Sequence, residues 1–177
     1  ISVVGVDPTE DYVSFARRGV PSSRATFQVS AAESLPFPDN SFDAAMALLV
    51  LQEFDDPGRA VREMARTTRR AGTVAASLWD FAEGMLMVSL FWQAAEAAAP
   101  EAVARRRAEH PPSRLGLQTL HELWIDAGLA EVRTACLELS QEFSSFDDYW
   151  LPFLTGCTPL CAFAVAVNRE TRGELAN

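Results

Sequence analysis

The stretch Glu33–Asp56 reads ESLPFPDNSFDAAMALLVLQEFDD and contains the clearest structural pattern in the chain. It opens with a turn at Pro36–Ser41, because proline fixes φ and Asp, Asn and Ser bond locally to the backbone. The run Phe42–Leu51 follows with little charge and predicts a strand buried on both faces, as in a parallel sheet. Asp56 is a good helix N-cap and Pro57 suits the first helical turn, so a helix is expected next. The stretch therefore predicts an α/β fold.

Composition predicts one soluble domain with a sizeable core. The chain has 177 residues, 49% of them hydrophobic, without the run of about 18 apolar residues that a membrane-spanning helix needs. The net charge of −9 disfavours nucleic acid as a partner, because phosphate contacts dominate that affinity. No signal peptide is visible, so the cytoplasm is the expected compartment. Nothing in the composition indicates a particular oligomeric state.

The cysteines and histidines suggest neither a disulfide framework nor a metal site. Cys157 and Cys161 are four residues apart and could share a helix face, whereas Cys136 stands alone. Because no His or Cys partner lies at metal-ligand spacing, buried thiols are favoured over a metal site. His110 and His121 lie away from the predicted strand ends, so neither is assigned as a general base.

A strand near the N-terminus ends in a carboxylate. Ser2–Val6 is a β-branched run followed by Asp7, and Thr9 is a possible N-cap for the next helix. In open α/β sheets an acid at a strand's carboxyl end is well placed to accept both hydroxyls of a nucleoside ribose. Alternatively, Asp7 only caps the helix together with Thr9, and position alone favours neither role. The helix should turn its apolar side chains toward the core, namely Tyr12, Val13, Phe15 and Ala16.

Periodicity and capping residues predict strands and helices in the remainder of the chain. The expected elements are a strand at Ala25–Val29, a helix from Pro57 ending near Arg69 and Arg70 with Gly72 as its C-cap, a strand at Thr73–Trp79, helices at Gly84–Ala99 and Leu117–Ala127, a strand at Ala130–Leu139, a helix capped by Ser145, and a last helix from Cys161.

Two of these regions have a functional alternative. The Met- and aromatic-rich helix at Gly84–Ala99 and the aromatic cluster at Phe146–Phe153 are either ordinary core or the walls of an apolar acceptor pocket. Glu101–Pro112 is the least core-like segment. It contains the run Arg105–Arg107, which is expected to be a solvated face, although an anionic substrate group could use it.

Three stretches carry a family resemblance: VVGVDPTEDYVSFAR, QVSAAESLPFPDNSFDAAMALLVLQEFDDP and REMARTTRRAGTVAASLWDF. In this order they resemble the class I S-adenosylmethionine-dependent methyltransferases, in particular the branch similar to quinone-biosynthesis C-methyltransferases. AESLPFPDNSFDAA is the most specific part, and the resemblance extends from Ile1 to about Asp80. It implies a Rossmann-like sheet with helices on both faces, S-adenosylmethionine as cofactor and a small-molecule methyl acceptor as partner.

The resemblance also assigns cofactor-binding residues. It makes Asp7 the acid that holds the ribose hydroxyls, with Pro8 beside it. Ala31 and Ala32 fall where the family offers the adenine ring a polar side chain and then a backbone N–H, and Leu48 faces the methionine part through its backbone. Ala31 departs from the usual Asp or Asn, and one lost hydrogen bond of this kind costs roughly 0.5–1.5 kcal/mol. Glu33 is expected to hold the turn.

A second departure concerns the glycine-rich loop, G-x-G-x-G, that opens the family's fold, because nothing in this chain supplies it. The sheet is therefore expected to miss its first and last strands. Loss of the first would leave a gap roughly 10 Å wide between Ser2–Val6 and Phe42–Leu51, since neighbouring strands lie about 4.8 Å apart. Residues 1–177 are predicted to form a single truncated domain, with a helical substrate-side insertion at about 81–116.

The leading functional hypothesis is methyl transfer from S-adenosylmethionine to a small apolar or aromatic acceptor. Glu53 and Asp80, near predicted strand ends, are the candidates if the reaction needs a base. The first alternative is a truncated or degenerate relative that acts as a non-catalytic module without cofactor binding. The second is a nicotinamide-dependent dehydrogenase, which shares the ribose-binding acid but not the turn at Pro36–Phe42.

Overall fold

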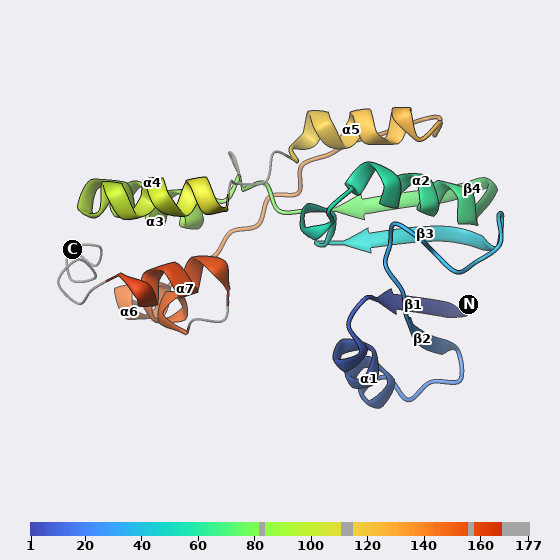
Figure 1. Ribbon diagram of the computed structural model, residues 1–177, viewed down its shortest axis with the longest axis horizontal. Coiled ribbons are helices and arrows are strands. Elements are labelled where there is room, and N and C mark those ends of the chain that lie inside the picture. Colours follow the sequence, from blue (N-terminus) through green and yellow to red (C-terminus); the bar gives the residue numbers. More distant parts are fainter. Residues whose placement is uncertain (82–83, 111–114, 156–157, 168–177) are drawn as a thin grey trace. The chain divides into compact units, whose positions relative to one another are not determined.

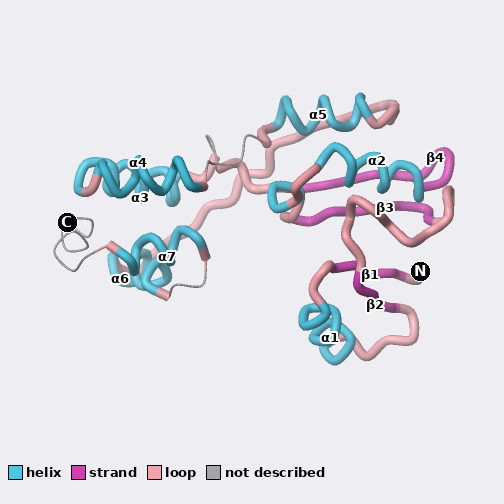
Figure 2. The backbone as a smooth tube through the Cα atoms, in the orientation of Figure 1, coloured by secondary structure: helices cyan, strands magenta, loops and turns pink. Residues whose placement is uncertain are grey.

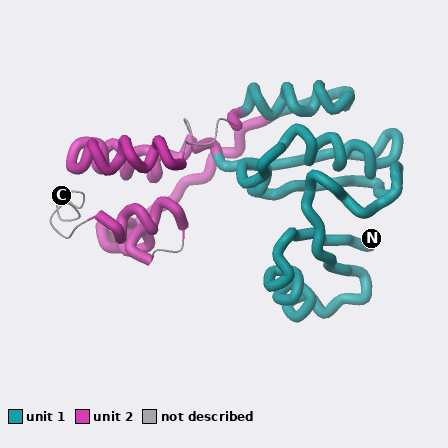
Figure 3. Tube along the Cα trace, viewed as in Figure 1, with its two compact units in different colours: residues 1–79, 117–134 teal, residues 80–116, 135–177 magenta. Residues whose placement is uncertain are grey.

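A computed structural model describes residues 1–81, 84–110, 115–155 and 158–167 (Figure 1). The chain divides into two compact units (Figure 3). Unit 1 consists of Ile1–Trp79 and Leu117–Thr134, and unit 2 consists of Asp80–Gly116 and Ala135–Asn177. Unit 1 contains every described strand, whereas the regular structure described in unit 2 is helical.

The strands of unit 1 form two parallel pairs (Figure 2). In the first pair β1 lies beside β2, with Val3 opposite Ala25, and in the second β3 lies beside β4, with Leu48 opposite Ser77. The predicted break in the sheet is confirmed, because no described strand pairs with the other edge of β1 or of β3. The elements are β1 (Val3–Asp7), α1 (Glu10–Gly19), β2 (Ala25–Val29), β3 (Phe42–Leu48), the 3-10 helix η1 (Leu51–Glu53), α2 (Pro57–Thr67), β4 (Thr68–Ser77) and α5 (Leu117–Asp126).

The α/β class and the parallel pairing are as predicted, but the burial of β3 is not. Of its seven residues only Ala47 is buried, while Met46 and Leu48 are 77% and 72% exposed. The prediction of a strand buried on both faces is therefore wrong, because α2 packs against β3 and can cover only one face of the strand. The strand also ends earlier, and Leu51 is fully buried in η1 instead.

Helix α1 covers the first strand pair with a narrow apolar stripe. It packs against β1 and β2 and buries Val13, whereas Tyr12 and Phe15 are 67% and 70% exposed. The expectation that Tyr12 and Phe15 face the core is wrong, because a two-stranded sheet is too narrow to cover them.

Helix α2 covers the second strand pair and begins as predicted. The Asp56 carboxylate accepts a hydrogen bond from the backbone N–H of Arg59 at 2.8 Å, and Pro57 occupies the first turn. The predicted end near Arg69 and Arg70 is wrong. The helix ends at Thr67 because the buried hydroxyls of Thr67 and Thr68 donate to carbonyls of the last turn, those of Glu63 and Met64, and the chain enters β4 at once.

Gly72 lies inside β4 rather than at a helix C-cap. A glycine is needed at this position because neighbouring atoms leave no room for a side chain. A Cβ at this position would lie 2.7 Å from the Asp43 carbonyl oxygen and 2.8 Å from that of Arg69. Gly72→Ala is expected to lower the free energy of unfolding by about 1–3 kcal/mol, since backbone must move. Urea denaturation measures the loss. Gly19→Ala is the control, because a Cβ there meets nothing within 4 Å, and an equal loss in both variants would contradict the account.

Helix α5 returns to unit 1 and packs on α2. The Trp124 indole N–H donates to the Val74 carbonyl of β4 at 3.0 Å, and Gly128 follows the helix with φ +77°. The strand predicted at Ala130–Leu139 is wrong. The described structure has no regular element there, and Leu137 and Leu139 are 86% and 81% exposed, because no strand offers this segment a partner.

Unit 2 is a cluster of helices around aromatic side chains. Its elements are α3 (Leu86–Ala98), α4 (Pro100–Glu109), α6 (Phe146–Trp150), the 3-10 helix η2 (Leu151–Leu154) and α7 (Pro159–Ala166). Phe91 stacks on Phe153 and Trp150, with ring centroids 5.0 Å and 6.0 Å apart. The core consists of Phe91, Ala95, Val103, Trp150, Phe153, Phe163 and Ala164.

In unit 2 the predicted cap of α6 is confirmed, and two other segments differ from the prediction. Ser145 caps α6 by accepting the N–H of Asp148. The segment predicted to be least core-like forms α4 instead, and its Val103 is fully buried while its arginines stay at the surface. The last helix starts at Pro159 rather than Cys161. Pro111, Pro112, Cys157 and the residues after Val167 lie outside the described residues.

Among the described residues no single helix is both long and apolar enough to cross a membrane. The sharply bent pair Phe146–Leu154 and Pro159–Ala166 reaches the required length and apolar composition only when the two are taken together.

Candidate functional site

Asp7 is the last residue of β1 and is half-buried. One carboxylate oxygen accepts the N–H of Thr9 at 2.8 Å, and the Thr9 side chain itself makes no capping bond. Asp7 therefore shapes the entry to α1, as one of the two alternatives expected. The other carboxylate oxygen accepts no hydrogen bond from any residue in the described part of the chain, so it remains available to a ligand hydroxyl.

The turn after β2 lies beside Asp7, because the Ser30 N–H donates to the Asp7 carbonyl at 3.0 Å. Ala31 and Ala32 follow in this turn, which is closed by a bond from the Ser34 N–H to the Ala31 carbonyl. Ala31 offers only a methyl group. The backbone N–H of Ala32 has no acceptor among the residues described, so one donor is free at the carboxyl end of the first strand pair.

Two unpaired oxygens lie at the carboxyl end of the second strand pair. Leu48 ends β3 opposite Ser77, and the Leu49 N–H donates to the Ser77 carbonyl at 2.8 Å. Leu49 has φ +57°, a conformation that is rare for leucine and is found at functional sites. Within the described residues the buried side-chain oxygens of Gln52 and Ser77 have no hydrogen-bond partner.

Such buried oxygens are costly unless a ligand or water satisfies them. Gln52 and Ser77 were missed from the sequence. Each is a polar residue that directly follows an apolar run, in LVLQ and VAAS. That pattern is too frequent in protein sequences to single out these two residues.

The turn Leu35–Asp39 is held by a pair of charged residues on α2, which the sequence did not predict. The Glu63 carboxylate accepts the Leu35 N–H at 2.8 Å and the Arg66 Nε–H at 2.7 Å. Arg66 also donates to the carbonyls of Leu35 and Phe37 and pairs with Asp39 at 2.7 Å. Glu33, which was expected to hold the turn, makes no side-chain bond to the described residues.

The hydrogen bond from Arg66 lowers the pKa of Glu63 below its ordinary value of 4.5, and the bond from Leu35 acts in the same direction against partial burial. A lowered folded-state pKa gives stability that is present above pH 4.5 and is lost as the pH falls through the folded pKa. Glu63→Gln is expected to remove this component. Urea midpoints at pH 7 and pH 4 should then differ less in this variant than in the parent chain. Glu33→Gln is the control, and a parental pH dependence in Glu63→Gln would contradict the assignment.

The two candidate bases occupy different units. Glu53 is exposed in η1, and no described residue bonds its carboxylate. Asp80 belongs to unit 2, where its carbonyl accepts the N–H groups of Gly84 and Met85.

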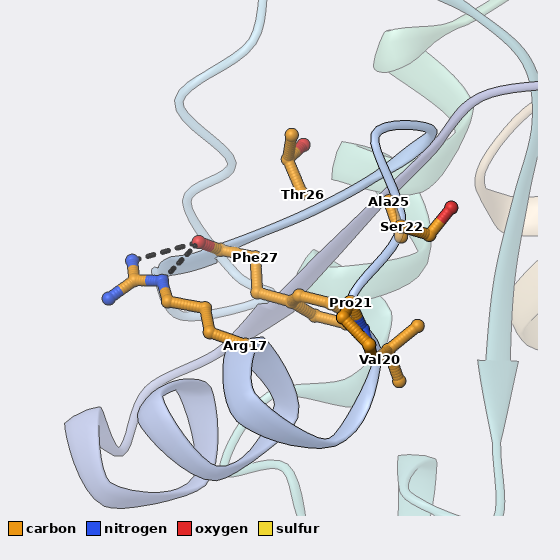
Figure 4. A pocket seen from close by; sticks show the side chains of 7 residues that line it. All are labelled: Arg17, Val20, Pro21, Ser22, Ala25, Thr26 and Phe27. Atoms are coloured by element: carbon orange, nitrogen blue, oxygen red, sulfur yellow. Dashed lines mark hydrogen bonds between the residues drawn. The ribbon is translucent and has the colours of Figure 1, made fainter.

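A pocket of about 360 Å³ lies between α1 and β2 (Figure 4). The Arg17 guanidinium donates to the Phe27 carbonyl at 3.0 Å and 2.8 Å. The pocket reaches β2 at Ala25–Phe27, whereas Asp7 lies opposite Val29 at the other end of the strand, so it is distinct from the predicted site. No group of three His, Cys, Asp or Glu residues that could hold a metal ion occurs in the ranges that the structure describes.

Parallel strands flanked by helices, with an acid ending the first strand, define a Rossmann-like α/β fold of the kind that binds nucleosides. Comparison with known proteins identifies a family within this class of fold: residues 1–76 match the methyltransferase domain family. That segment is homologous to methyltransferases, as the resemblance implied, and its relatives imply S-adenosylmethionine as the cofactor.

Three relatives illustrate the match. The uncharacterized methyltransferase YcgJ of Bacillus subtilis is 45% identical over 74 residues, 39% of this chain and 28% of that protein. A crystal structure of YcgJ from this species has a TM-score of 0.57 at 22% identity, over 97% of this chain and 71% of that chain.

The ubiquinone/menaquinone biosynthesis C-methyltransferase UbiE of Citrifermentans bemidjiense is 33% identical over 78 residues, 42% of this chain and 33% of that protein. A structure from Thermotoga maritima, described as a SAM-dependent methyltransferase and possible histamine N-methyltransferase, has a TM-score of 0.53 at 26% identity, over 70% of this chain and 53% of that chain. The matched segments thus span about a third or less of the two curated relatives.

The residues present fit part of this cofactor. A free carboxylate oxygen at Asp7 and a free N–H at Ala32 suit the ribose hydroxyls and the adenine ring of a nucleoside, and the unpaired oxygens of Gln52 and Ser77 suit polar groups of an amino acid. Asp7 and Ala32 lie at the carboxyl end of the first strand pair, and Gln52 and Ser77 lie at the carboxyl end of the second.

Proposed function

We propose that this chain is part of a methyltransferase that uses S-adenosylmethionine to methylate a small apolar or aromatic acceptor. The observation that carries the proposal is Asp7, an acid with one free carboxylate oxygen at the end of β1, in a segment homologous to methyltransferases. The acceptor class is supported by the name of the UbiE relative, which acts in quinone biosynthesis, and quinones have a planar apolar ring system.

The chain's contribution would be binding and orientation. Asp7 accepts the ribose hydroxyls, the Ala32 N–H donates to the adenine ring, and the Leu48 backbone with Gln52 and Ser77 holds the methionine part. When bound, the cofactor would supply an electrophilic methyl group to the acceptor's nucleophilic atom, with the thioether sulfur as the leaving group. Such chemistry depends on proximity and exclusion of water more than on acid–base groups.

The acceptor side is proposed to be the helical segment at about 81–116. Val88, Phe91 and Ala95 are buried in α3, and Phe91 and Ala95 belong to the core of unit 2. Two other apolar residues of α3, Leu86 and Leu90, are 66% and 49% exposed and are free to contact an apolar acceptor. Where the acceptor must lose a proton, Glu53 and Asp80 stay the proposed bases.

A non-catalytic module is the second candidate, and specific observations favour it. β1 and β3 each leave one edge unpaired among the described strands, and Ala31 lacks the polar side chain that would contact adenine. A scaffold of this kind could present its strand edges to a partner without binding a cofactor.

Thermal unfolding with added ligands tests the proposal. Because a ligand that binds only the folded state adds about 2.7 kcal/mol at 100 times its Kd, S-adenosylmethionine should raise the unfolding midpoint measurably. NAD should not raise it. A rise with NAD alone would favour a nicotinamide-dependent enzyme, and no rise with either would favour the non-catalytic module.

A further inference from the structure

An open groove of about 560 Å³ lies between α4 and α7, two helices of unit 2. This volume is within the range of about 300–1,000 Å³ that is usual for small-molecule sites. Most of the residues that line the groove are apolar, and the charged ones come from α4. The lining consists of Ala102, Arg105, Arg106, Glu109, His110, Pro159, Ala162, Phe163, Ala166 and Val167.

The apolar wall of the groove is formed by Phe163, whose ring packs against other aromatic rings of the unit 2 core. Phe163 is 8% exposed and contacts Trp92 and Phe91, with ring centroids 5.1 Å and 6.3 Å apart. Ala162 and Ala166 are exposed beside it on α7, and their small side chains leave the space open. A supported aromatic ring flanked by small residues is a surface on which a hydrocarbon chain or a flat ring can lie.

The charged wall has an excess of positive charge. Arg107 does not line the groove, and it is neutralised by Glu96 at 2.7 Å. By contrast, no ion pair within the described residues holds Arg105 or Arg106, and Arg106 only donates to the His110 carbonyl at 3.5 Å. Two guanidinium groups and the single carboxylate of Glu109 therefore leave about one unbalanced positive charge, in a chain whose net charge is −9.

We propose that this groove binds an apolar molecule that carries one carboxylate. Its apolar part lies on Phe163, Ala162 and Ala166, and its carboxylate pairs with Arg105 or Arg106, since a guanidinium binds a carboxylate through two parallel hydrogen bonds. A single negative charge matches the unbalanced positive charge, while Glu109 and the acidic chain oppose a polyanion. The inference concerns unit 2 alone and does not rest on the proposed methyl transfer.

Titration calorimetry with decanoate, below the concentration at which it forms micelles, tests the charge. The parent chain should bind decanoate saturably and bind decanol at least about tenfold more weakly, because a charge-assisted hydrogen bond contributes about 1.5–3 kcal/mol. Arg105→Ala combined with Arg106→Ala should weaken decanoate binding at least about tenfold. Arg107→Ala, the matched control, should leave it within about twofold. No saturable binding, equal binding of decanol, or equal losses with Arg107→Ala would each overturn the proposal.

Ala162→Trp tests the location. Ala162 is exposed, so the larger side chain can fill the groove without entering the core, and it should abolish decanoate binding while leaving the urea midpoint unchanged. Undiminished binding in Ala162→Trp would show that decanoate binds elsewhere and would overturn the assignment.

Discussion

Phe91→Ala is expected to lower the free energy of unfolding by about 3–5 kcal/mol, because it removes a large aromatic side chain from a closed core. Phe91 is 2% exposed and contacts four other rings, those of Trp92, Trp150, Phe153 and Phe163. These residues come from α3, α6, η2 and α7, so the cavity would loosen most of unit 2. The helices are short, and their stability depends on this packing more than on helix propensity.

Urea denaturation followed by tryptophan fluorescence measures the loss, since Trp92 and Trp150 both lie beside Phe91. Phe15→Ala is the control. Phe15 is 70% exposed on α1, and its removal should change stability by no more than about 0.5 kcal/mol. Equal losses in the two variants would show that the aromatic cluster is not the core of unit 2.

Asp7→Asn is expected to weaken S-adenosylmethionine binding by about 10- to 100-fold, since hydrogen bonds to a charged acceptor contribute about 1.5–3 kcal/mol. The substitution is chosen because asparagine keeps an oxygen that can accept the Thr9 N–H, so the turn into α1 should survive. What is lost is the negative charge and the free oxygen that would accept a ribose hydroxyl.

Calorimetry gives the affinity, and thermal unfolding without ligand checks that the turn is intact. Asp11→Asn is the matched control. Asp11 is exposed in the first turn of α1, and its substitution removes the same charge from the chain. Undiminished affinity in Asp7→Asn, or an equal loss in Asp11→Asn, would contradict the assignment of Asp7.

Local features of the fold were predictable because they depend on short-range chemistry. The strand that ends at Asp7, the Asp56 cap of α2 and the Ser145 cap of α6 follow from a few neighbouring residues. Burial was not predictable in this way. The apolar run that includes Met46 predicted a strand covered on both faces, but burial depends on the elements that pack on each face, which the run itself does not specify.

Long-range pairing explains the other errors. Alternation predicted a strand at Ala130–Leu139, but a strand forms only where another strand offers hydrogen bonds, and no described strand does so here. The run Arg105–Arg107 predicted a solvated segment, and its arginines are at the surface, but Val103 two residues earlier anchors the same helix in the core.

In the candidate site, too, local features were predictable from the sequence and long-range contacts were not. The position of Asp7 followed from a strand ending in an acid. The unpaired oxygens of Gln52 and Ser77 depend on how η1 and β4 pack together, and the hold of Glu63 and Arg66 on the turn joins residues about thirty positions apart. Relations of that kind are set by the tertiary structure and are not visible in a local pattern.

We propose that the carboxyl ends of these strands bind S-adenosylmethionine. Titration calorimetry of the parent chain with S-adenosylmethionine tests it most directly, on a sample whose cooperative urea transition shows that it is folded. We expect a saturable heat of binding with one cofactor bound per chain. A folded sample that gives no heat of binding at any cofactor concentration would contradict it.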